Sequence, residues 1–435
     1  MKIYTYPSEA AEKRIDAIIN RNLEFKQKDL NAVRRMLNDV RNNGDKAVIS
    51  YIRQFDSPGL EINELKVTSD EFKGAEKHVD RSFIETLNLA ISQIKSFHRK
   101  QVRQSWINMD RKGTFLGQLI NPVDAAGVYV PGAKGGTTPL VSSVLMGVIP
   151  ARIAGVQKVF VATPSMENGE VNSHLLVAAK KAGADAVYKM GSAWAIGAFA
   201  YGTETVPKVD VIVGPGNIYV TLAKKIIMGT VGIDMIAGPS EVLVIADKHA
   251  NPDYIAADLL SQAEHDMLAS AIMITDWPKM AALVKNALEH QIEQLSRKEI
   301  AQASLKTFGA IFVVSDITDA ITLSNRIAPE HLELQIETPF AYMGEIKNAG
   351  AIFLGSYTPE PIGDYIAGPN HVLPTAGTAR FSSALSVDHF IKRSSIIYYS
   401  EAAFKREASH VIRLAEIEGL DAHAHAVQIR LKGKG

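Results

Sequence analysis

Two polar residues in the segment ADLLSQAEHD could bind a metal ion. Gln262 and His265 lie three residues apart at the end of a stretch with helical apolar spacing, so both side chains lie on one face of the helix. Imidazole is a common metal ligand, whereas an amide oxygen is an uncommon ligand for zinc. A structural or surface histidine explains this segment as well, so the segment by itself leaves both interpretations open.

Two further segments contain side chains of the same kind. Asp364 lies in GDYIAGPNH, where glycines let the backbone approach closely and aim one carboxylate into a crevice, although an Asx turn explains it equally. His423 and His425 stand at i and i+2, which point apart on a helix, so at most one of them serves a given site. A site made of Gln262, His265, Asp364 and His423 would have N and O ligands, and would be six-coordinate if a substrate supplied two more atoms. Such a site favours zinc or manganese.

The segment IAPEHLEL contains an acid and a base side by side. Pro329 biases Ala328 towards an extended conformation, and we expect Glu330 and His331 to face opposite ways on extended backbone. The two side chains could then reach different partners, one a water and the other a substrate oxygen, as a general acid and base. An ordinary surface Glu-His pair is the alternative.

Two glycine-rich segments could bind a nucleotide. GVYVPGAKGGTTPLVSSVLM and VDVIVGPGNIYVT both predict a strand, a glycine-rich loop and a helix, whose first backbone amides can hold phosphate oxygens. Neither matches the GxGxxG fingerprint, because Tyr219 stands where the third glycine after Gly214 and Gly216 would be. Ordinary turns between strands and helices explain these glycines as well.

Composition narrows the partners and the chemistry. The chain has 435 residues, 46% of them hydrophobic, which is enough for two or more packed domains. Lys and Arg number 47 and so do Asp and Glu, so there is no net charge to attract nucleic acid or a membrane surface. No stretch approaches the length of a membrane span, and we expect a cytoplasmic protein. The absence of cysteine excludes thiolate nucleophiles, disulfides and Cys-bound zinc.

The elements that position these residues alternate between strand and helix. From Ile15 to about Arg103 the apolar spacing is helical, and after Gly127 short apolar runs alternate with amphipathic helices. The predicted strands are 159–163, 186–190, 209–214, 241–247, 270–275, 310–314 and 351–355. This alternation predicts an α/β fold with two Rossmann-like, doubly wound parallel sheets, flanked by small helical N- and C-terminal segments.

Five of these segments together resemble the signature blocks of histidinol dehydrogenases. They are AGPSEVLVIAD, DLLSQAEHD, APEHLEL, GDYIAGPNHVLPT and EGLDAHAHAV, in the order of the family, and the resemblance runs from about Asp124 to Arg430. It implies an enzyme that oxidises L-histidinol through the aldehyde to L-histidine, the last step of histidine biosynthesis, with two NAD and one zinc per active site. A water activated by Glu330 and aided by His331 could hydrate the aldehyde without a cysteine.

The resemblance also implies roles for particular residues. The family's zinc ligands, which also contact the substrate, fall on Gln262, His265, Asp364 and His423. Its proton acceptors fall on Glu330 and His331, and its other substrate contacts on Ser240, His331 and Glu418. Its NAD contacts fall on Tyr129 and Asn217. In this family the C-terminal segment crosses to a second subunit, which implies a homodimer with shared active sites.

The same resemblance implies a division of the chain into domains. Residues 1–30 would be an N-terminal helical segment, and residues 31–128 plus 240–384 would form the first α/β domain, with the zinc and catalytic residues. Residues 129–239 would form the second α/β domain, on the NAD side. Residues 385–435 would be a tail that reaches the partner subunit.

Two departures from the family pattern lie on the NAD side. Trp194, in GSAWAI, stands where the family usually has glutamine, and the loop 133–141 is about three residues longer than the common pattern. Three alternatives stay open: a related dehydrogenase of another primary alcohol such as a sulfonated diol, a zinc hydrolase, and a noncatalytic metal-binding member. Glu418 favours histidinol, because a carboxylate suits a basic imidazole better than a sulfonate. The sequence leaves open NAD against NADP, zinc against manganese, and the stereochemistry of hydride transfer.

Overall fold

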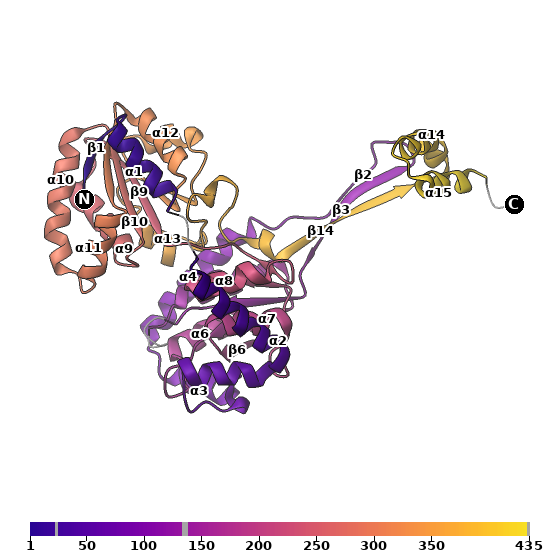
Figure 1. Ribbon diagram of the computed structural model, residues 1–435, viewed down its shortest axis with the longest axis horizontal. Helices are drawn as coiled ribbons and strands as arrows, with labels where there is room; N and C mark the ends of the chain where they lie inside the picture. The colour runs from indigo at the N-terminus through magenta and orange to yellow at the C-terminus, as the bar shows by residue number, and fades with distance from the viewer. Residues whose placement is uncertain (22–24, 133–137, 433–435) are drawn as a thin grey trace. The chain divides into compact units, whose positions relative to one another are not determined.

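The computed structural model describes residues 1–21, 25–132 and 138–432 of the chain (Figure 1). It consists of two units. The first comprises Met1–Gln101 and Val123–Phe390, and the second comprises Val102–Pro122 and Ile391–Gly435. Part of the loop 133–141, which the sequence analysis singled out for its length, lies outside the described residues.

Within the described part of the first unit, six parallel strands form one sheet, called here sheet A. Their order across the sheet is β1-β11-β10-β9-β12-β13. The strands are β1 (Ile3–Thr5), β9 (Glu241–Ala246), β10 (Ser270–Thr275), β11 (Ala310–Val313), β12 (His331–Gln335) and β13 (Ala351–Leu354). The direction of winding reverses between β9 and β12, which makes that gap the switch point of a doubly wound sheet.

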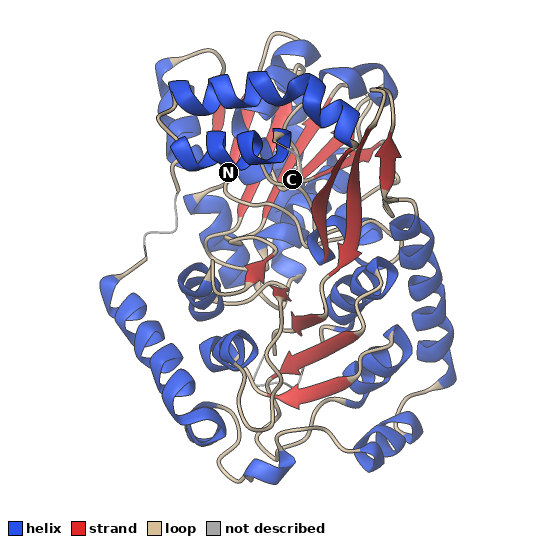
Figure 2. Ribbon diagram, turned by 90° about the vertical axis from the view of Figure 1, so that its right-hand side faces the viewer, coloured by secondary structure: helices blue, strands red, loops and turns tan. Residues whose placement is uncertain are grey.

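Helices cover both faces of sheet A. The buried apolar side chains of β9 alternate between the two faces, and each set packs against helices. Val242 and Val244 pack against one set of helices, whereas Leu243 and Ile245 pack against another. The first set is α9 (Pro252–Ala263), α10 (Pro278–Gln291) and α11 (Lys298–Thr307). The second is α1 (Glu9–Ile19) and α12 (Ile317–Ile327). Figure 2 shows helices on either side of these strands.

A second parallel sheet, sheet B, has the order β6-β5-β4-β7-β8. Its strands are β4 (Ala125–Tyr129), β5 (Lys158–Thr163), β6 (Ala186–Lys189), β7 (Val211–Val213) and β8 (Gly232–Ile233). Its switch point lies between β4 and β7. Two doubly wound parallel sheets are what the strand and helix pattern predicts, and this expectation is confirmed.

Sheet B also has helices on both faces. One core contains α4 (Arg81–Arg99), α5 (Val141–Ala154) and α6 (Ser173–Ala182), with α3 (Ser69–Lys77) at its edge. The other contains α2 (Gln27–Phe55), α7 (Ser192–Tyr201) and α8 (Ile218–Ile227). The sequence analysis grouped α2 and α4 with residues 240–384, but their apolar side chains share cores with sheet B. A helical pattern shows that one face is buried, but not against which sheet.

The second unit is an antiparallel ribbon followed by two helices. In the described residues its strands have the order β14-β3-β2, with β14 (Ile391–Tyr399) paired along the whole of β3 (Thr114–Pro122), and β2 (Trp106–Asn108) on the other side. The helices are α14 (Glu401–Ile417) and α15 (Asp421–Leu431). The sequence analysis did not predict this ribbon. In the described part of the chain, no helix combines the length and apolar character needed to cross a membrane.

Candidate active site

A cavity of about 160 Å³ in the first unit brings together six of the residues that the sequence singled out. They are Ser240, Gln262, His265, Glu330, His331 and Asp364. They come from four places in the fold: the segment before β9, the end of α9, the start of β12, and α13 (Glu360–Tyr365). Residues far apart in the sequence therefore form one polar site.

The position of this cavity relative to the two sheets is informative. Ser240 and Glu330 stand immediately before β9 and β12, so the cavity lies at the amino ends of the strands that flank the switch point of sheet A. Pro215, two residues after β7, lines the same cavity from the carboxyl end of sheet B at its own switch point. Ligands of doubly wound sheets usually bind at the carboxyl ends of the strands. The cavity has this position relative to sheet B but not relative to sheet A.

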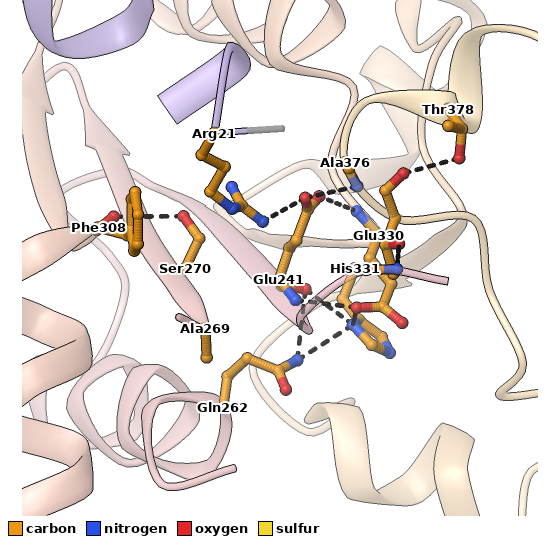
Figure 3. Close-up of polar contacts among 12 residues, drawn as sticks. Arg21, Glu241, Gln262, Ala269, Ser270, Phe308, Glu330, His331, Ala376 and Thr378 are labelled. Atoms are coloured by element: carbon orange, nitrogen blue, oxygen red, sulfur yellow. Dashed lines mark hydrogen bonds and ion pairs between the residues drawn. The ribbon is translucent and has the colours of Figure 1, made fainter. Parts of the chain in front are cut away.

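Glu330 and His331 point to the same neighbour, contrary to the expectation that they face opposite ways. The Glu330 carboxylate accepts the backbone N–H of Glu241 at 2.8 Å, and Nδ1 of His331 lies 2.8 Å from the carbonyl oxygen of Glu241 (Figure 3). Nδ1 of His331 is 3.7 Å from Oε2 of Glu330. The backbone just before the pair also differs from the prediction. Ala328 is left-handed (φ 55°, ψ 63°), not extended as predicted, because it caps α12 through a bond from its N–H to the Ser324 carbonyl.

Burial shifts the pKa values of both Glu330 and His331. It raises the pKa of Glu330 well above the ordinary value for a glutamate, and the Glu241 carboxylate adds to this effect. Burial also lowers the pKa of His331, which favours its neutral form. Nδ1 of His331 has two neighbours, the Glu241 carbonyl oxygen at 2.8 Å and the amide nitrogen of Gln262 at 3.2 Å. The carbonyl oxygen can only accept, and the amide nitrogen donates to Glu360 and to the same carbonyl, so the shorter contact places the histidine proton on Nδ1. Nε2 is then the basic nitrogen, and it has no hydrogen-bond partner among the described residues.

Glu360 is a site residue that the sequence analysis missed. Its Oε2 accepts a hydrogen bond of 2.9 Å from Nε2 of Gln262, and its Oε1 lies 3.9 Å from Nε2 of His331. It stands four residues before Asp364, so helical spacing could have identified it. His371 also lines the cavity, with Nδ1 3.1 Å from the carbonyl oxygen of Asp364.

The donor atoms of the cavity fit a hard divalent cation. His331, Glu360 and Asp364 place one potential ligand atom each within 4.8 Å of one another. Burial raises the pKa values of Glu360 and Asp364 to about 7, and the Glu360 carboxylate contributes to the shift of Asp364. A cation would offset this concentration of buried negative charge. Gln262 and His265 border the same cavity, so the predicted ligand set and this cluster share Asp364.

Other residues with predicted roles lie outside the cavity. Tyr129 ends β4, is buried, and accepts a hydrogen bond from the Ser192 backbone N–H at 3.0 Å. Asn217 caps α8, its side chain accepting backbone N–H groups of the first helical turn. Glu418 and His423 belong to the second unit and are exposed there.

Trp194, which the sequence analysis singled out as a departure, lies in the apolar core on one face of sheet B. Its ring stacks on those of Tyr51 and Phe55, with ring centroids 5.7 and 5.6 Å away. The indole N–H has no hydrogen-bond partner among the described residues. Trp194 is therefore held by apolar packing, and it makes none of the polar contacts that a glutamine could make.

Comparisons with known proteins identify the family of the chain. A family model described as histidinol dehydrogenase matches residues 19–431. The chain is 54% identical over 401 residues to the histidinol dehydrogenase of Desulfotalea psychrophila, with 92% of each chain covered. It is 49% identical over 421 residues to that of Clostridium acetobutylicum, covering 97% of this chain and 96% of the relative.

A solved structure supports the same family assignment. The crystal structure of histidinol dehydrogenase from Elizabethkingia anophelis matches with a TM-score of 0.93 at 39% identity, over 99% of this chain and 98% of that one. The resemblance of the five sequence blocks is thereby confirmed. The chain belongs to the histidinol dehydrogenase family and is an oxidoreductase.

Proposed function

We propose that the chain oxidises L-histidinol through the aldehyde to L-histidine, transferring two hydrides to NAD. The observation that carries this proposal is the cavity in which two buried proton carriers, Glu330 and His331, lie beside side chains of the types that bind metal ions. The identity to histidinol dehydrogenases over nearly the whole chain supports the choice of substrate.

The first oxidation removes a proton and a hydride from the alcohol. Nε2 of His331 is the free basic nitrogen, and it accepts the hydroxyl proton while the hydrogen on carbon leaves as hydride to NAD. The Glu241 carbonyl, bonded to Nδ1, keeps the ring in this tautomer and orientation. The product of the step is the aldehyde.

The second oxidation needs a water molecule. Glu330 accepts a proton from water as its oxygen adds to the aldehyde carbon, and the resulting anion of the hydrate then gives up a second hydride to NAD and becomes the acid. The raised pKa makes Glu330 a stronger base than an exposed carboxylate. No cysteine is available to form a thioester, so water addition is the route that the residues of this chain support.

We propose that zinc is held by Gln262, His265, Asp364 and, from a second copy of the chain, His423. When bound, zinc supplies a positive charge that attracts and orients the polar groups of the substrate. Burial also lowers the pKa of His265, which keeps its imidazole neutral, the form that binds metal.

A homodimer with shared sites follows from the same proposal. The second unit carries Glu418 and His423, and it exposes large apolar side chains that a partner surface would cover. Ile397, Leu414 and Ile417 are 70%, 61% and 64% exposed. We propose that this unit completes the site of a second copy, with Glu418 binding the imidazole of the substrate.

NAD is proposed to bind at the switch point of sheet B. Tyr129 ends β4 and Asn217 begins α8, on the two sides of this switch point. The turn between β7 and α8 is tight: a Cβ on Gly214 (φ 113°) would lie 2.1 Å from the Tyr129 carbonyl oxygen. Pro215, in this turn, borders the cavity, so a nucleotide held here would be next to the substrate.

The test is the yield of NADH per histidinol consumed by the metal-loaded enzyme. We expect about two, one for each hydride transfer. A yield of one would mean that oxidation stops at the aldehyde. A sulfonated diol is the second substrate in the same assay, and NADH from the diol but none from histidinol would overturn the proposal. NADH formation from neither alcohol would instead favour the hydrolase alternative.

A further inference from the structure

We infer that the buried ion pair between Arg21 and Glu241 is a positioning device for the active site. It rests on the proposed function, in which Glu330 and His331 carry protons. Arg21 follows α1, in the N-terminal part of the chain, and does not line the cavity. It acts through Glu241, which bonds to both proton carriers.

The pair is enclosed. Arg21 Nη2 donates to Oε1 of Glu241, and the two side chains are only 5% and 6% exposed. The guanidinium lies 5.8 Å from the centre of the Phe308 ring, which covers it (Figure 3). A charge-assisted bond is stronger than a neutral one, and here it is shielded from water, so it restrains the Glu241 carboxylate.

The Glu241 carboxylate connects two segments that border the cavity. Oε2 accepts the backbone N–H of Glu330 at 3.1 Å, and Oε1 accepts that of Ala376 at 2.8 Å. Ala376 is left-handed (φ 54°), a conformation that alanine rarely adopts, and it follows Thr375, a residue of the cavity wall. One side chain thus fixes the backbone on two sides of the cavity.

The main chain of Glu241 fixes the proton carriers themselves. Its N–H donates to Oε2 of Glu330 at 2.8 Å, and its carbonyl oxygen accepts from Nδ1 of His331 at 2.8 Å. Glu241 and Glu330 therefore exchange bonds reciprocally, each carboxylate accepting the backbone N–H of the other residue. A shift of Glu241 would move both groups on which the proposed chemistry depends.

The positive charge of Arg21 stabilises the buried Glu241 carboxylate. The Glu241 carboxylate accepts three N–H donors, and an amide in its place would turn an N–H group towards one of them. Glu241 also lies beside the Glu330 carboxylate, and the two negative charges repel. Without Arg21, Glu241 would be a buried charge with no compensation and would shift or take up water.

The experiment compares Arg21→Met, Arg21→Lys and Glu241→Gln by kcat, KM for NAD, bound zinc and melting temperature. Arg14→Met is the matched control, because Arg14 lies in α1 and donates to the Gly309 carbonyl, outside the cavity. We expect Arg21→Met and Glu241→Gln to lower kcat by about 10- to 100-fold, the effect of a displacement of about 1 Å, with KM for NAD unchanged. Arg21→Lys, which keeps the charge, should recover part of the loss. Arg14→Met should leave kcat as it is.

Two results would overturn the inference. One is a wild-type kcat in folded Arg21→Met, and the other is a loss of kcat in Arg14→Met as large as in Arg21→Met, which would indicate general destabilisation. If Arg21→Met does not fold, the decision passes to Arg21→Lys and Glu241→Gln, where an unchanged kcat in both contradicts the inference. Absence of NADH formation from histidinol by the wild-type protein would instead contradict the proposed function.

Discussion

Replacing Glu330 by glutamine should separate catalysis from stability. The amide oxygen of the introduced side chain can still accept the Glu241 backbone N–H that the carboxylate accepts at 2.8 Å, so the shape of the site is kept. The side chain can no longer take a proton. Loss of a general base typically costs 10²- to 10⁴-fold in rate, or about 3–5 kcal/mol in the barrier. We expect this loss in aldehyde oxidation, where water must be activated, and a smaller one in alcohol oxidation.

The same substitution should not weaken the fold, and its effect should depend on pH. The pKa of Glu330 is raised by burial and by the Glu241 carboxylate when the protein is folded. The stability that a raised acid contributes is full below its unfolded pKa and is lost as pH rises through its folded pKa. Glutamine does not titrate. The melting temperature of Glu330→Gln should therefore rise relative to wild type between a low pH, near the ordinary glutamate pKa of about 4.3, and a higher pH above the raised pKa of the folded protein.

The assay measures NADH formation from histidinol and from the aldehyde separately, and the melting temperature of metal-free protein at both pH values. Glu337→Gln is the control, because it removes the same charge from a side chain that is 67% exposed. Equal losses in the two half reactions would refute the role of Glu330 in activating water. A variant that melts below wild type at the higher pH would refute the electrostatic reasoning.

Three further predictions concern the metal, the dimer and the cofactor side. His265→Asn should lower bound zinc, measured by atomic absorption, more than Glu360→Gln does; the reverse result would favour the cluster of His331, Glu360 and Asp364 as the ligand set. Mixed dimers of a His423→Asn chain and an Asp364→Asn chain should regain activity, since one of their two sites has every ligand, whereas no recovery would contradict shared sites. Trp194→Gln should lower the free energy of unfolding in urea by about 3–5 kcal/mol, because it removes a buried ring stacked on two others.

Sequence patterns predicted the parallel sheets because their strands are continuous buried apolar runs. All six residues of β9 (Glu241–Ala246) are buried, as are all six of β10 (Ser270–Thr275), and runs of this kind are typical of parallel strands covered on both faces. The ribbon of β3 and β14 was missed for the opposite reason. Most residues of β14 (Ile391–Tyr399) are exposed, and after Ile391 its polar residues come first and its apolar ones last, so the sequence lacks the regular alternation that indicates a strand with one buried face.

The sequence predicted site residues whose side chains line the cavity, but not residues that support the site without lining it. Gln262, His265 and Asp364 were found because their residue types suit metal binding, and the structure places them around one cavity. Glu241 escaped notice because a glutamate at the start of an apolar strand is typical of a surface position. Its partner Arg21 lies 220 positions away in the sequence, and no local pattern relates the two.

The opposite polarity of the two sheet edges at the cavity has a kinetic consequence for the proposed reaction. The groups proposed to bind the substrate lie at the amino edge of sheet A, and the turn proposed to bind the nucleotide lies at the carboxyl edge of sheet B. Reduced nucleotide can then be exchanged for oxidised nucleotide on one side while the substrate stays anchored on the other. A reactive aldehyde could thus be retained between two turnovers of the coenzyme, without ever being free in the cell.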